Sequence, residues 1–422
     1  MRVLVTGQVG LDKKAYLEQL ARHARDQGEE LSLFHIGDMM YREAPDVPPG
    51  RILDLPLARL HSLRRAVMRD VLAALPRHKH VLINTHATFR WRHGLFSAFD
   101  FDQLAQFDAD LYVTLVDNIE SVHQRMVRDT ELDHSLKDLM VWREEEILAT
   151  EICAKAHVLS RPQEPASLRR SAASSLTSDS RPLTPKFYVL SRGRHTPTVD
   201  TLFKLVFRPH MKKVYPSFPM SHVTDLPDTL AEINAFRATM AQHFITFDPG
   251  DVDEKLLADK ALAAAREGKQ HIELATLDEG SGAGGQGSDA RPDPAASASA
   301  PRTPHPASTP HSKLPTREVL DIAGDIDGQI YSRDFILVRQ ADMIVSYIPE
   351  LPTGKPGLSS GVERELQHAH EHAKDVYVIW KPAKEPSPFI TQTANKVFRS
   401  VDEAVAFFEH KGYFAPHDLF GS

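Results

Sequence analysis

The sequence contains one cysteine, Cys153, in 422 residues. A disulfide needs two cysteines and a cysteine-based zinc site needs several, so the chain by itself forms neither. A chain that makes no use of disulfides is typical of a reducing compartment, and we expect the protein to be cytoplasmic.

Long apolar runs and an excess of positive charge are also missing. No run reaches the roughly 18 apolar residues of a transmembrane helix, so we expect no membrane partner. The chain has 50 lysine and arginine residues against 57 aspartate and glutamate residues, a formal net charge of −7. Binding to nucleic acid irrespective of its sequence depends on a cationic surface, so we expect no nucleic-acid partner.

The chain is otherwise that of a folded protein, with 41% hydrophobic residues. Domains average about 150 residues, so two or three domains are expected. Two segments, 160–185 and 279–314, consist mostly of small, polar and proline residues. Such compositions bury too little apolar surface to offset the entropy lost on ordering, and we expect both segments to be flexible.

The rest of the chain alternates short apolar strands with helical patterns, which is typical of parallel sheets covered by helices on both faces. We predict an α/β protein with two doubly wound, Rossmann-like parallel-sheet domains joined by a flexible linker. The first covers 1–208 and includes the flexible insertion 160–185. The second covers 211–412 and includes the disordered insertion 279–314. Strands are predicted at 2–6, 31–36, 81–83, 111–116 and 187–190, then at 213–215, 244–247, 343–347 and 376–380.

A candidate phosphate-binding loop joins the first predicted strand to a helix. Backbone N–H groups and a helix N-terminus can hold a phosphate at such a position, and the usual pattern is G-x-x-x-x-G-K-[ST]. Gly7 and Lys13 match this pattern, and Gly10 lies within the loop. Asp12 replaces the second glycine, and Lys14 replaces the hydroxyl residue that would bind Mg²⁺. The alternative is an ordinary strand–turn–helix start.

The segments that follow resemble the archaeal-type adenylate kinases, a family of nucleoside monophosphate kinases. The resemblance covers roughly 1–208. It is carried by the stretches Phe34-His35-Ile36-Gly37-Asp38-Met39-Met40, Ile83-Asn84-Thr85-His86-Ala87 and Arg125-Met126-Val127-Arg128-Asp129-Thr130. The resemblance implies that ATP and magnesium bind at the loop. It also implies nucleotide-binding roles for Gly7, Gly10, Lys13, Asp38, Arg125 and Arg128.

Several departures from that family fall where phosphoryl transfer needs charge neutralisation. Phosphoryl transfer depends on positioning and on Lys, Arg and Mg²⁺. Asn84 stands where the family has an aspartate, and the lid continues Glu131-Leu132-Asp133 where the family has more arginine. We therefore expect a nucleotide-binding or purely structural domain with lost or altered kinase activity. The alternative is an active nucleoside monophosphate kinase.

The second predicted domain contains two carboxylates in a suggestive arrangement. Ser359, Ser360 and Gly361 begin a helix, where N–H groups and hydroxyls at the positive end of the dipole can hold a phosphate. Glu365 lies about one turn into this helix and Asp334 lies on the preceding one. Paired carboxylates around a sugar carbon are the usual equipment for glycosyl transfer. The alternative is that Ser359 is an N-cap and that Glu363 and Glu365 are ordinary first-turn acids.

The order of elements resembles the nucleoside 2-deoxyribosyltransferase superfamily, most closely its 2′-deoxynucleoside 5′-phosphate N-hydrolase branch. The resemblance covers roughly 211–259 and 316–412. It is carried by Asp334, by Gln340-Ala341-Asp342 before an apolar strand, by the motif Ser359-Ser360-Gly361-Val362-Glu363-Arg364-Glu365-Leu366, and by an opening strand and turn with Tyr215, Pro216, Ser217 and Pro219. It implies that Glu365 attacks C1′ of the sugar, that Asp334 assists as an acid and that Ser359 holds the 5′-phosphate. It also implies substrate binding by Tyr215, Ser217, Ser360 and Gly361.

We therefore predict a nucleotide-processing enzyme, an N-glycosidase that hydrolyses or transfers the base–sugar bond of a (deoxy)nucleoside 5′-monophosphate. This chemistry requires no metal and no cofactor, and the loop near Lys13 is the place for ATP and magnesium. The alternative is a nucleotide-binding sensor without turnover. The superfamily often builds its pockets across a subunit interface, so we expect a homodimer with a nucleotide substrate.

Overall fold

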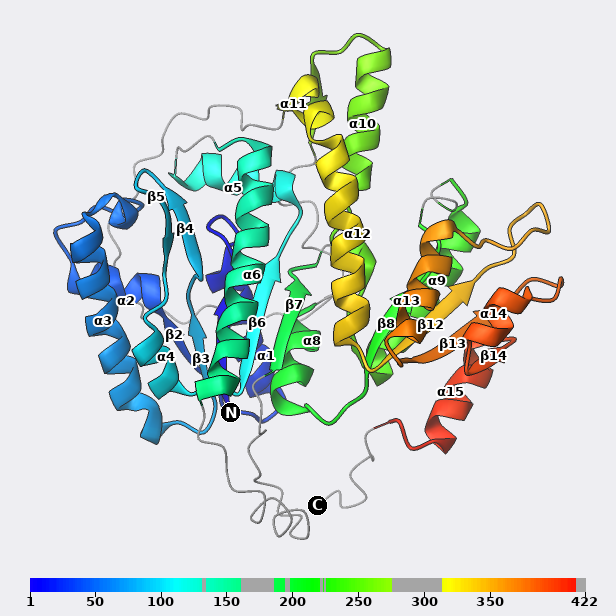
Figure 1. The fold of residues 1–422 in the computed structure, drawn as a ribbon, viewed down its shortest axis with the longest axis horizontal. Coiled ribbons are helices and arrows are strands. Elements are labelled where there is room, and N and C mark those ends of the chain that lie inside the picture. Colours follow the sequence, from blue (N-terminus) through cyan, green and yellow to red (C-terminus); the bar gives the residue numbers. More distant parts are fainter. Residues whose placement is uncertain are drawn as a thin grey trace, which may run out of the picture.

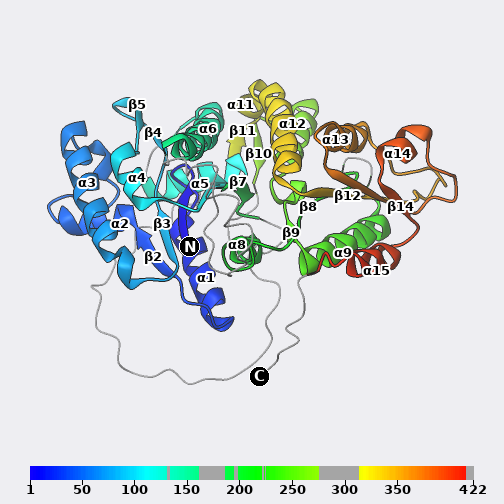
Figure 2. The same ribbon diagram turned by 60° about the horizontal axis from the view of Figure 1, so that its bottom comes forward.

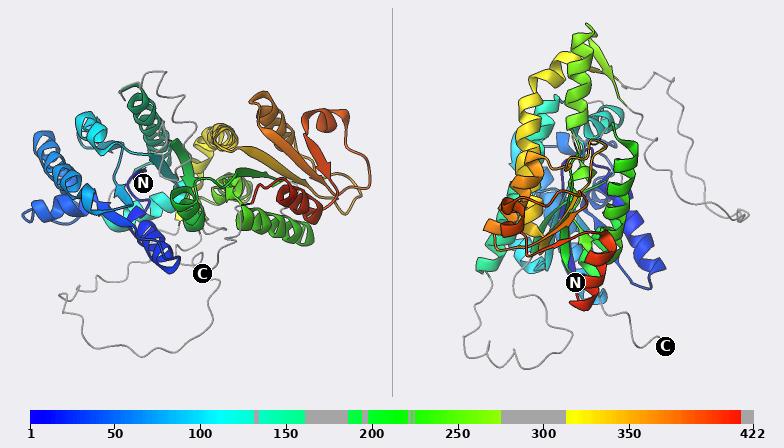
Figure 3. Two further views of the ribbon diagram at one scale, coloured as in Figure 1. Left: turned by 90° about the horizontal axis from the view of Figure 1, so that it is seen from below. Right: turned by 90° about the vertical axis from the view of Figure 1, so that its right-hand side faces the viewer.

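The structure is a computed structural model that describes residues 1–130, 134–160, 186–193, 198–220, 223, 225–274 and 313–414. These residues form two α/β units that lie side by side, each built on a parallel sheet of five strands (Figures 1 and 3). The predicted fold class is thereby confirmed. Of the segments predicted to be flexible, 161–185 and 279–312 lie outside the described residues.

The first unit has a sheet in which the first strand is central. The strand order is β2 (Ser32–His35), β3 (Val81–Asn84), β1 (Arg2–Thr6), β6 (Leu111–Val116) and β7 (Lys186–Ser191). Val3, Leu4 and Val5 of β1 are fully buried because helices cover both faces of the sheet.

The helices of the first unit form two layers. On one face α1 (Lys13–Asp26) packs against α8 (Thr198–Phe207), and α6 (Leu136–Ser160) lies on the other (Figure 2). The remaining elements are α2 (Ile36–Glu43), η1 (Ile52–Asp54), α3 (Leu57–Ala74), η2 (Leu75–Arg77), β4 (Thr88–Trp91), β5 (Gly94–Ser97), α4 (Phe101–Phe107) and α5 (Ile119–Thr130). The antiparallel hairpin of β4 and β5 was not predicted.

The second unit has the strand order β14 (Lys396–Phe398), β13 (Asp375–Trp380), β12 (Met343–Ile348), β8 (Lys213–Ser217) and β9 (Ile245–Thr246). One face carries α9 (Pro227–His243) and α15 (Val401–His410), and the other carries α12 (Ala323–Gln340), α13 (Ser360–Glu371) and α14 (Pro388–Thr393) (Figure 2). The helices that follow β8 and β12 thus lie on opposite faces. The carboxyl ends of these two strands therefore border a topological switch point, where ligands bind in open parallel sheets.

An extension of the second unit projects beyond its sheet (Figure 1). It begins after η3 (Pro249–Asp251) and contains α10 (Lys255–Arg266), the hairpin of β10 (His271–Glu273) and β11 (Lys313–Pro315), and α11 (Thr316–Asp321). The last residues of the segment predicted to be disordered, Lys313 and Leu314, are therefore ordered. Leu314 is buried because it pairs with Ile272 across the hairpin.

The two units meet along a seam that contains α12 (Figure 1). The side chain of Gln340 accepts a hydrogen bond from the Val189 N–H (3.0 Å) and donates one to the Val189 carbonyl (2.8 Å). Val189 belongs to β7, the edge strand of the first sheet. The chain connection, expected to be a flexible linker, is short and hydrogen-bonded, with the Met211 N–H donating to the Arg208 carbonyl (3.0 Å).

The sequence had suggested that Pro216 lies in a turn. In the structure it lies inside β8. Strand β9 pairs only with Lys213 and Val214, so at Pro216 one edge of β8 is free and no backbone N–H is needed there. In the described part of the chain, no helix combines the length and apolarity of a bilayer span.

Candidate functional site

The predicted nucleophile Glu365 lies on α13 and contacts strand β8. Its Oε1 accepts a hydrogen bond from the Tyr215 hydroxyl (2.9 Å), and its Oε2 accepts one from the Ser217 hydroxyl (2.6 Å). Tyr215 and Ser217 are alternate residues of one strand and therefore face the same side of the sheet. Both are fully buried. The structure thus brings together three of the predicted site residues at the switch point.

Asp334 is the second carboxylate of this site. It lies on α12, is 9% exposed, and its Oδ1 has no hydrogen-bond partner among the described residues. Burial raises the pKa of Asp334 to about 6, against the opposing effect of Arg333. Burial and the charge of Asp334 raise the pKa of Glu365 to about 8, despite the hydrogen bonds from Ser217 and Tyr215. The charges interact, so we treat the two acids as one pair that holds a single proton near neutral pH.

Tyr215 remains a hydrogen-bond donor throughout this range. Burial, followed by the charges of Glu365 and Asp334, raises the pKa of its hydroxyl well above the usual value. A neutral phenol donates to a carboxylate and so favours the ionised form of Glu365. Asp334 receives no such bond at its buried Oδ1. The lower pKa nevertheless belongs to Asp334, so in the free protein the shared proton lies mainly on Glu365, and ionised Glu365 with protonated Asp334 is the minor arrangement of the same pair.

The predicted phosphate-binding residues lie at the start of α13. Ser359 is the N-cap, and its Oγ accepts a hydrogen bond from the Val362 N–H (3.2 Å). The capping alternative is therefore correct for Ser359, but its hydroxyl hydrogen remains available to an anion. Ser360 and Gly361 are exposed in the first turn, as is Glu363.

The loop of the first unit requires both of its glycines. Gly7 has φ +135°, and an added Cβ would lie 2.6 Å from the Leu115 carbonyl oxygen. Gly10 has φ +86°, and an added Cβ would lie 2.7 Å from Cγ of Met126 on α5. Within the described structure, the backbone N–H groups of residues 8, 9, 10 and 12 donate to no other backbone group. They remain available to an anion.

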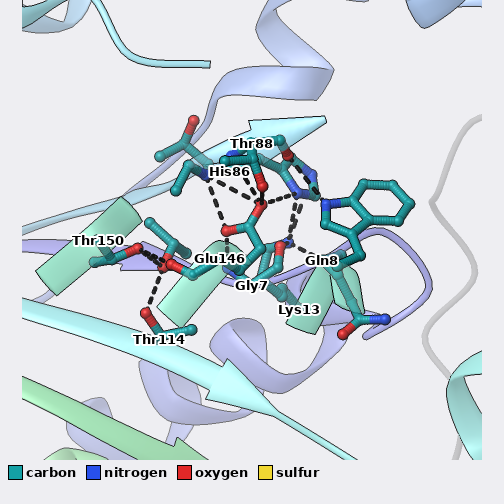
Figure 4. A network of polar contacts seen from close by, with 12 residues as sticks. Gly7, Gln8, Lys13, His86, Thr88, Thr114, Glu146 and Thr150 are labelled. Atoms are coloured by element: carbon teal, nitrogen blue, oxygen red, sulfur yellow. Dashed lines mark hydrogen bonds and ion pairs between the residues drawn. The ribbon is translucent and has the colours of Figure 1, made fainter. Parts of the chain in front are cut away.

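Lys13 is folded back onto its own loop (Figure 4). Its ammonium donates to the Gly7 carbonyl and to the Gln8 carbonyl (3.3 Å), and lies 3.2 Å from Nδ1 of His86. Burial lowers the pKa of Lys13 to about 7, against the opposing charge of Glu146. Burial, then the charges of Lys13 and Arg64, lower the pKa of His86, which stays neutral.

Glu146 on α6 is a buried carboxylate that the sequence did not reveal (Figure 4). It accepts hydrogen bonds from the backbone N–H groups of Gly7 (3.1 Å), Ala87 (2.9 Å) and Thr88 (3.0 Å). It therefore joins the loop after β1 to the segment after β3.

Two arginines flank the loop on the side of α5. Arg125 donates to Asp117 (2.7 Å) and to the Gly10 carbonyl (3.2 Å). Arg192 lies 3.2 Å from the Asp12 carboxylate and 3.8 Å from that of Asp117. Asp12, which replaces a glycine, is in the left-handed region at φ 53°. Arg128, the other predicted arginine of α5, is exposed.

A cavity of about 290 Å³ lies beside the loop, between it, α2, α3 and the β4–β5 hairpin. The predicted residue Asp38 lines it and forms an ion pair with Lys14 (2.6 Å). Arg64 also lines it, donates to the Thr85 hydroxyl (2.9 Å) and lies over the Phe89 ring. With Lys13 on its wall as well, the cavity suits an anionic ligand.

The loop residues fit a nucleotide phosphate but not magnesium. Free N–H groups, Lys13 and Arg125 supply donors for phosphate. The position of the usual hydroxyl ligand is occupied by Lys14, and Asn84 donates to His35 (3.0 Å) where an aspartate is usual. The nearby carboxylate of Glu146 already accepts hydrogen bonds from backbone N–H groups, so it does not take the place of the missing aspartate. Within the described ranges, no three or more His, Cys, Asp or Glu residues gather to hold a metal ion. We derive no step through magnesium.

Two further buried residues, Arg143 and Glu254, form an ion pair across the seam, at 2.6 Å. Arg143 is on α6 and Glu254 directly precedes α10. No local pattern distinguishes them from surface charges, since only the packing of the two units buries them.

Comparison with known proteins bears on the first unit. A family model described as an AAA domain matches residues 6–143, a range that contains the loop, the cavity wall from α2 to β5, and Arg125. The match fits a nucleotide-binding, kinase-like P-loop domain. It ends before most of α6 and does not extend to the second unit. No curated protein matches the chain.

Proposed function

We propose that the second unit is an N-glycosidase that hydrolyses, or transfers, the base–sugar bond of a (deoxy)nucleoside 5′-monophosphate. The observation that carries the proposal is the position of Glu365. Its two oxygens accept bonds from Tyr215 and Ser217 at the switch point of the sheet, within electrostatic reach of Asp334.

The reaction needs one ionised and one protonated acid. A carboxylate oxygen of Glu365 attacks C1′ of the sugar, the C1′–N bond breaks, and its electron pair goes to the base. Asp334 gives its proton to the departing base. Water then attacks C1′ of the glycosyl ester, its proton goes to Asp334, and the Glu365 carboxylate is released. In a transferase, a second base replaces the water.

The proposed seat of the 5′-phosphate is the start of α13. Ser359, Ser360 and Gly361 offer hydroxyl and N–H groups at the positive end of the helix dipole. Glu365 lies about one turn further along the same helix. A phosphate bound at the N-terminus would therefore hold the sugar close to Glu365.

In this proposal the first unit binds a nucleotide and does not transfer phosphate efficiently. The N–H groups of residues 8–10, Lys13 and Arg125 support binding. Lys14 and Asn84 do not supply the ligands that would place magnesium for phosphoryl transfer. The homodimer implied by the family resemblance belongs to the same proposal, and light scattering of the purified chain tests it.

The test is the release of free base from a panel of deoxynucleoside and nucleoside 5′-monophosphates, measured by chromatography. Glu365→Gln should lower the rate on the order of a thousandfold or more, because the amide is not a nucleophile. Glu363→Gln is the matched control, since Glu363 is exposed in the preceding turn. It should retain most of the activity.

Three outcomes would count against the proposal. Equal loss of activity in both variants would indicate damage to the helix and not to a nucleophile. Nucleotide binding by the wild type without release of base from any substrate would favour the sensor function. ATP-dependent phosphorylation of a monophosphate that is lost in Lys13→Met would instead establish a kinase.

A further inference from the structure

We propose that Glu254, a residue of the second unit, is a positioning residue for the nucleotide site of the first unit. Through Glu254, nucleotide binding at the loop and the state of the Asp334–Glu365 pair are coupled. The coupling to the carboxylate pair rests on the proposed function, but the effect on nucleotide binding does not.

Glu254 is fully buried, and its contacts cross the seam. Its Oε1 accepts from the backbone N–H of Ile119 (2.9 Å) and from Arg143 (2.6 Å), and its Oε2 accepts from the other nitrogen of Arg143 (3.0 Å). Burial acts to raise the pKa of Glu254, but Arg143 and Arg333 together hold it below the usual value. The side chain is therefore an anion in the interface.

Ile119 is the first residue of α5, so the second unit satisfies the N-terminus of a helix in the first. The first N–H groups of a helix have no partner within it, and a carboxylate there also complements the helix dipole. The same arrangement occurs at α6, where the Leu136 N–H donates to Glu318 of α11 (2.9 Å). The first N–H groups of two helices in the first unit, α5 and α6, thus donate to carboxylates of the second unit.

Helix α5 in turn shapes the loop. Arg125 on α5 donates to the Gly10 carbonyl (3.2 Å), and Met126 on the same helix closely approaches Gly10. Arg143, held by Glu254, donates to the backbone carbonyl of Asp117 (3.1 Å), the residue whose carboxylate binds Arg125. Movement of Glu254 would therefore move Arg125 by two routes.

On the other side, Glu254 is linked to the carboxylate pair. Arg333 lies 3.7 Å from Glu254 and donates to the Val252 carbonyl (2.7 Å). Asp334 is the next residue of α12, and the charge of Arg333 lowers its pKa against the effect of burial. A change in the Arg333–Glu254 contact therefore alters the field at Asp334.

The direct test is calorimetric titration of the full-length protein with a non-hydrolysable ATP analogue. Glu254→Gln removes the charge and keeps the shape. We expect its affinity for the analogue to fall at least about fivefold, the lower limit of typical coupling between sites. Glu267→Gln is the control, because Glu267 is exposed at the end of α10 and its side chain bonds only to Lys269 in the described structure. An unchanged affinity in a folded Glu254→Gln protein would overturn the proposal and leave Glu254 with a purely structural role.

A second measurement keeps the proposal testable if this variant does not fold. Hydrogen exchange of the wild type is compared with and without the ATP analogue. We expect slower exchange in the analogue complex not only around residues 7–13 but also at 249–254 and around Arg333 in the second half of α12. Protection confined to the first unit would contradict the coupling.

The link to the carboxylate pair has its own readout, the pH profile of base release. Loss of the Glu254 charge leaves the charge of Arg333 less compensated, so the acid limb should move to lower pH. An acid limb that does not move would overturn this part of the proposal. If the wild type releases no base, the glycosidase proposal fails, while the affinity and exchange measurements still decide the role of Glu254.

Discussion

At the scale of single residues, both sites depend on buried charged groups whose protonation differs from that in water. Glu365 and Asp334 share a proton because burial and mutual repulsion disfavour two negative charges. Burial lowers the pKa of Lys13 to about 7, so this lysine is about half protonated at neutral pH. In each case the contacts that hold the group also set the pH range in which it can act.

Base release should have a bell-shaped dependence on pH. The pair titrates at about 6 and about 8. Below the lower value both acids are protonated and no nucleophile is present. Above the higher value both are ionised and no acid can protonate the base. Initial rates between pH 4.5 and 9.5 check this, and a rate that keeps rising above about pH 9 would contradict it.

Nucleotide affinity should weaken as the pH rises above 7. The pKa of Lys13 is about 7 in the free protein, and a bound phosphate raises it because the charged form is stabilised. Below pH 7 the lysine is already charged and the affinity is greatest. Above it, binding must take up a proton. Titration calorimetry at pH 8 in two buffers of different ionisation enthalpy measures this uptake, which should vanish in Lys13→Met.

At the scale of elements, the alternation of strands and helices was predictable, because buried strands such as β1, β6 and β12 are short apolar runs. The β4–β5 hairpin was not, since Arg90, Arg92 and His93 interrupt the apolar pattern and no two-residue turn motif marks its turn. The family resemblance assigned Tyr215, Ser217 and Glu365 to one site, and the structure places them in contact, but the hydrogen bonds themselves were not predicted. The burial of Glu146 and Glu254 was not predicted, because it depends on elements that are distant in the sequence.

The N-cap of α13 gives a prediction at this scale. Ser359→Ala removes the acceptor of the Val362 N–H, and we expect the free energy of unfolding to fall by about 1 kcal/mol. Ser360→Ala, in the exposed first turn, should change it by less than about 0.5 kcal/mol. Urea unfolding, monitored by circular dichroism, measures the free energy of unfolding of both variants. Equal effects would show that the cap is not formed in solution.

At the scale of the whole molecule, the two units are joined by more than the chain connection. The buried Arg143–Glu254 pair, the caps on α5 and α6, and the bonds between Gln340 and Val189 all cross the seam. Removing one partner of such a contact leaves the other buried and unpaired. The loss of folding free energy is then larger than the net contribution of the contact itself. Neither unit is therefore expected to unfold independently of the other.

Calorimetry of the full chain should accordingly show a single unfolding transition. Gln340→Ala leaves the Val189 N–H and carbonyl without partners and should lower stability by about 1–3 kcal/mol while keeping one transition. Gln367→Ala, on the exposed side of α13, is the control. Two separate transitions in the wild type would show that the seam is weaker than its contacts suggest.

The bonds from Gln340 have one more consequence, which concerns self-association. An open strand edge is a template on which a second chain can add its own strand, the route to fibrils and aggregates. On β7 the Val189 amide and carbonyl are already engaged by a glutamine side chain, which cannot propagate a ladder. A chain that ends at residue 208 lacks Gln340, which leaves this edge of β7 open. The first unit produced alone should therefore precipitate under conditions in which the intact protein stays dispersed.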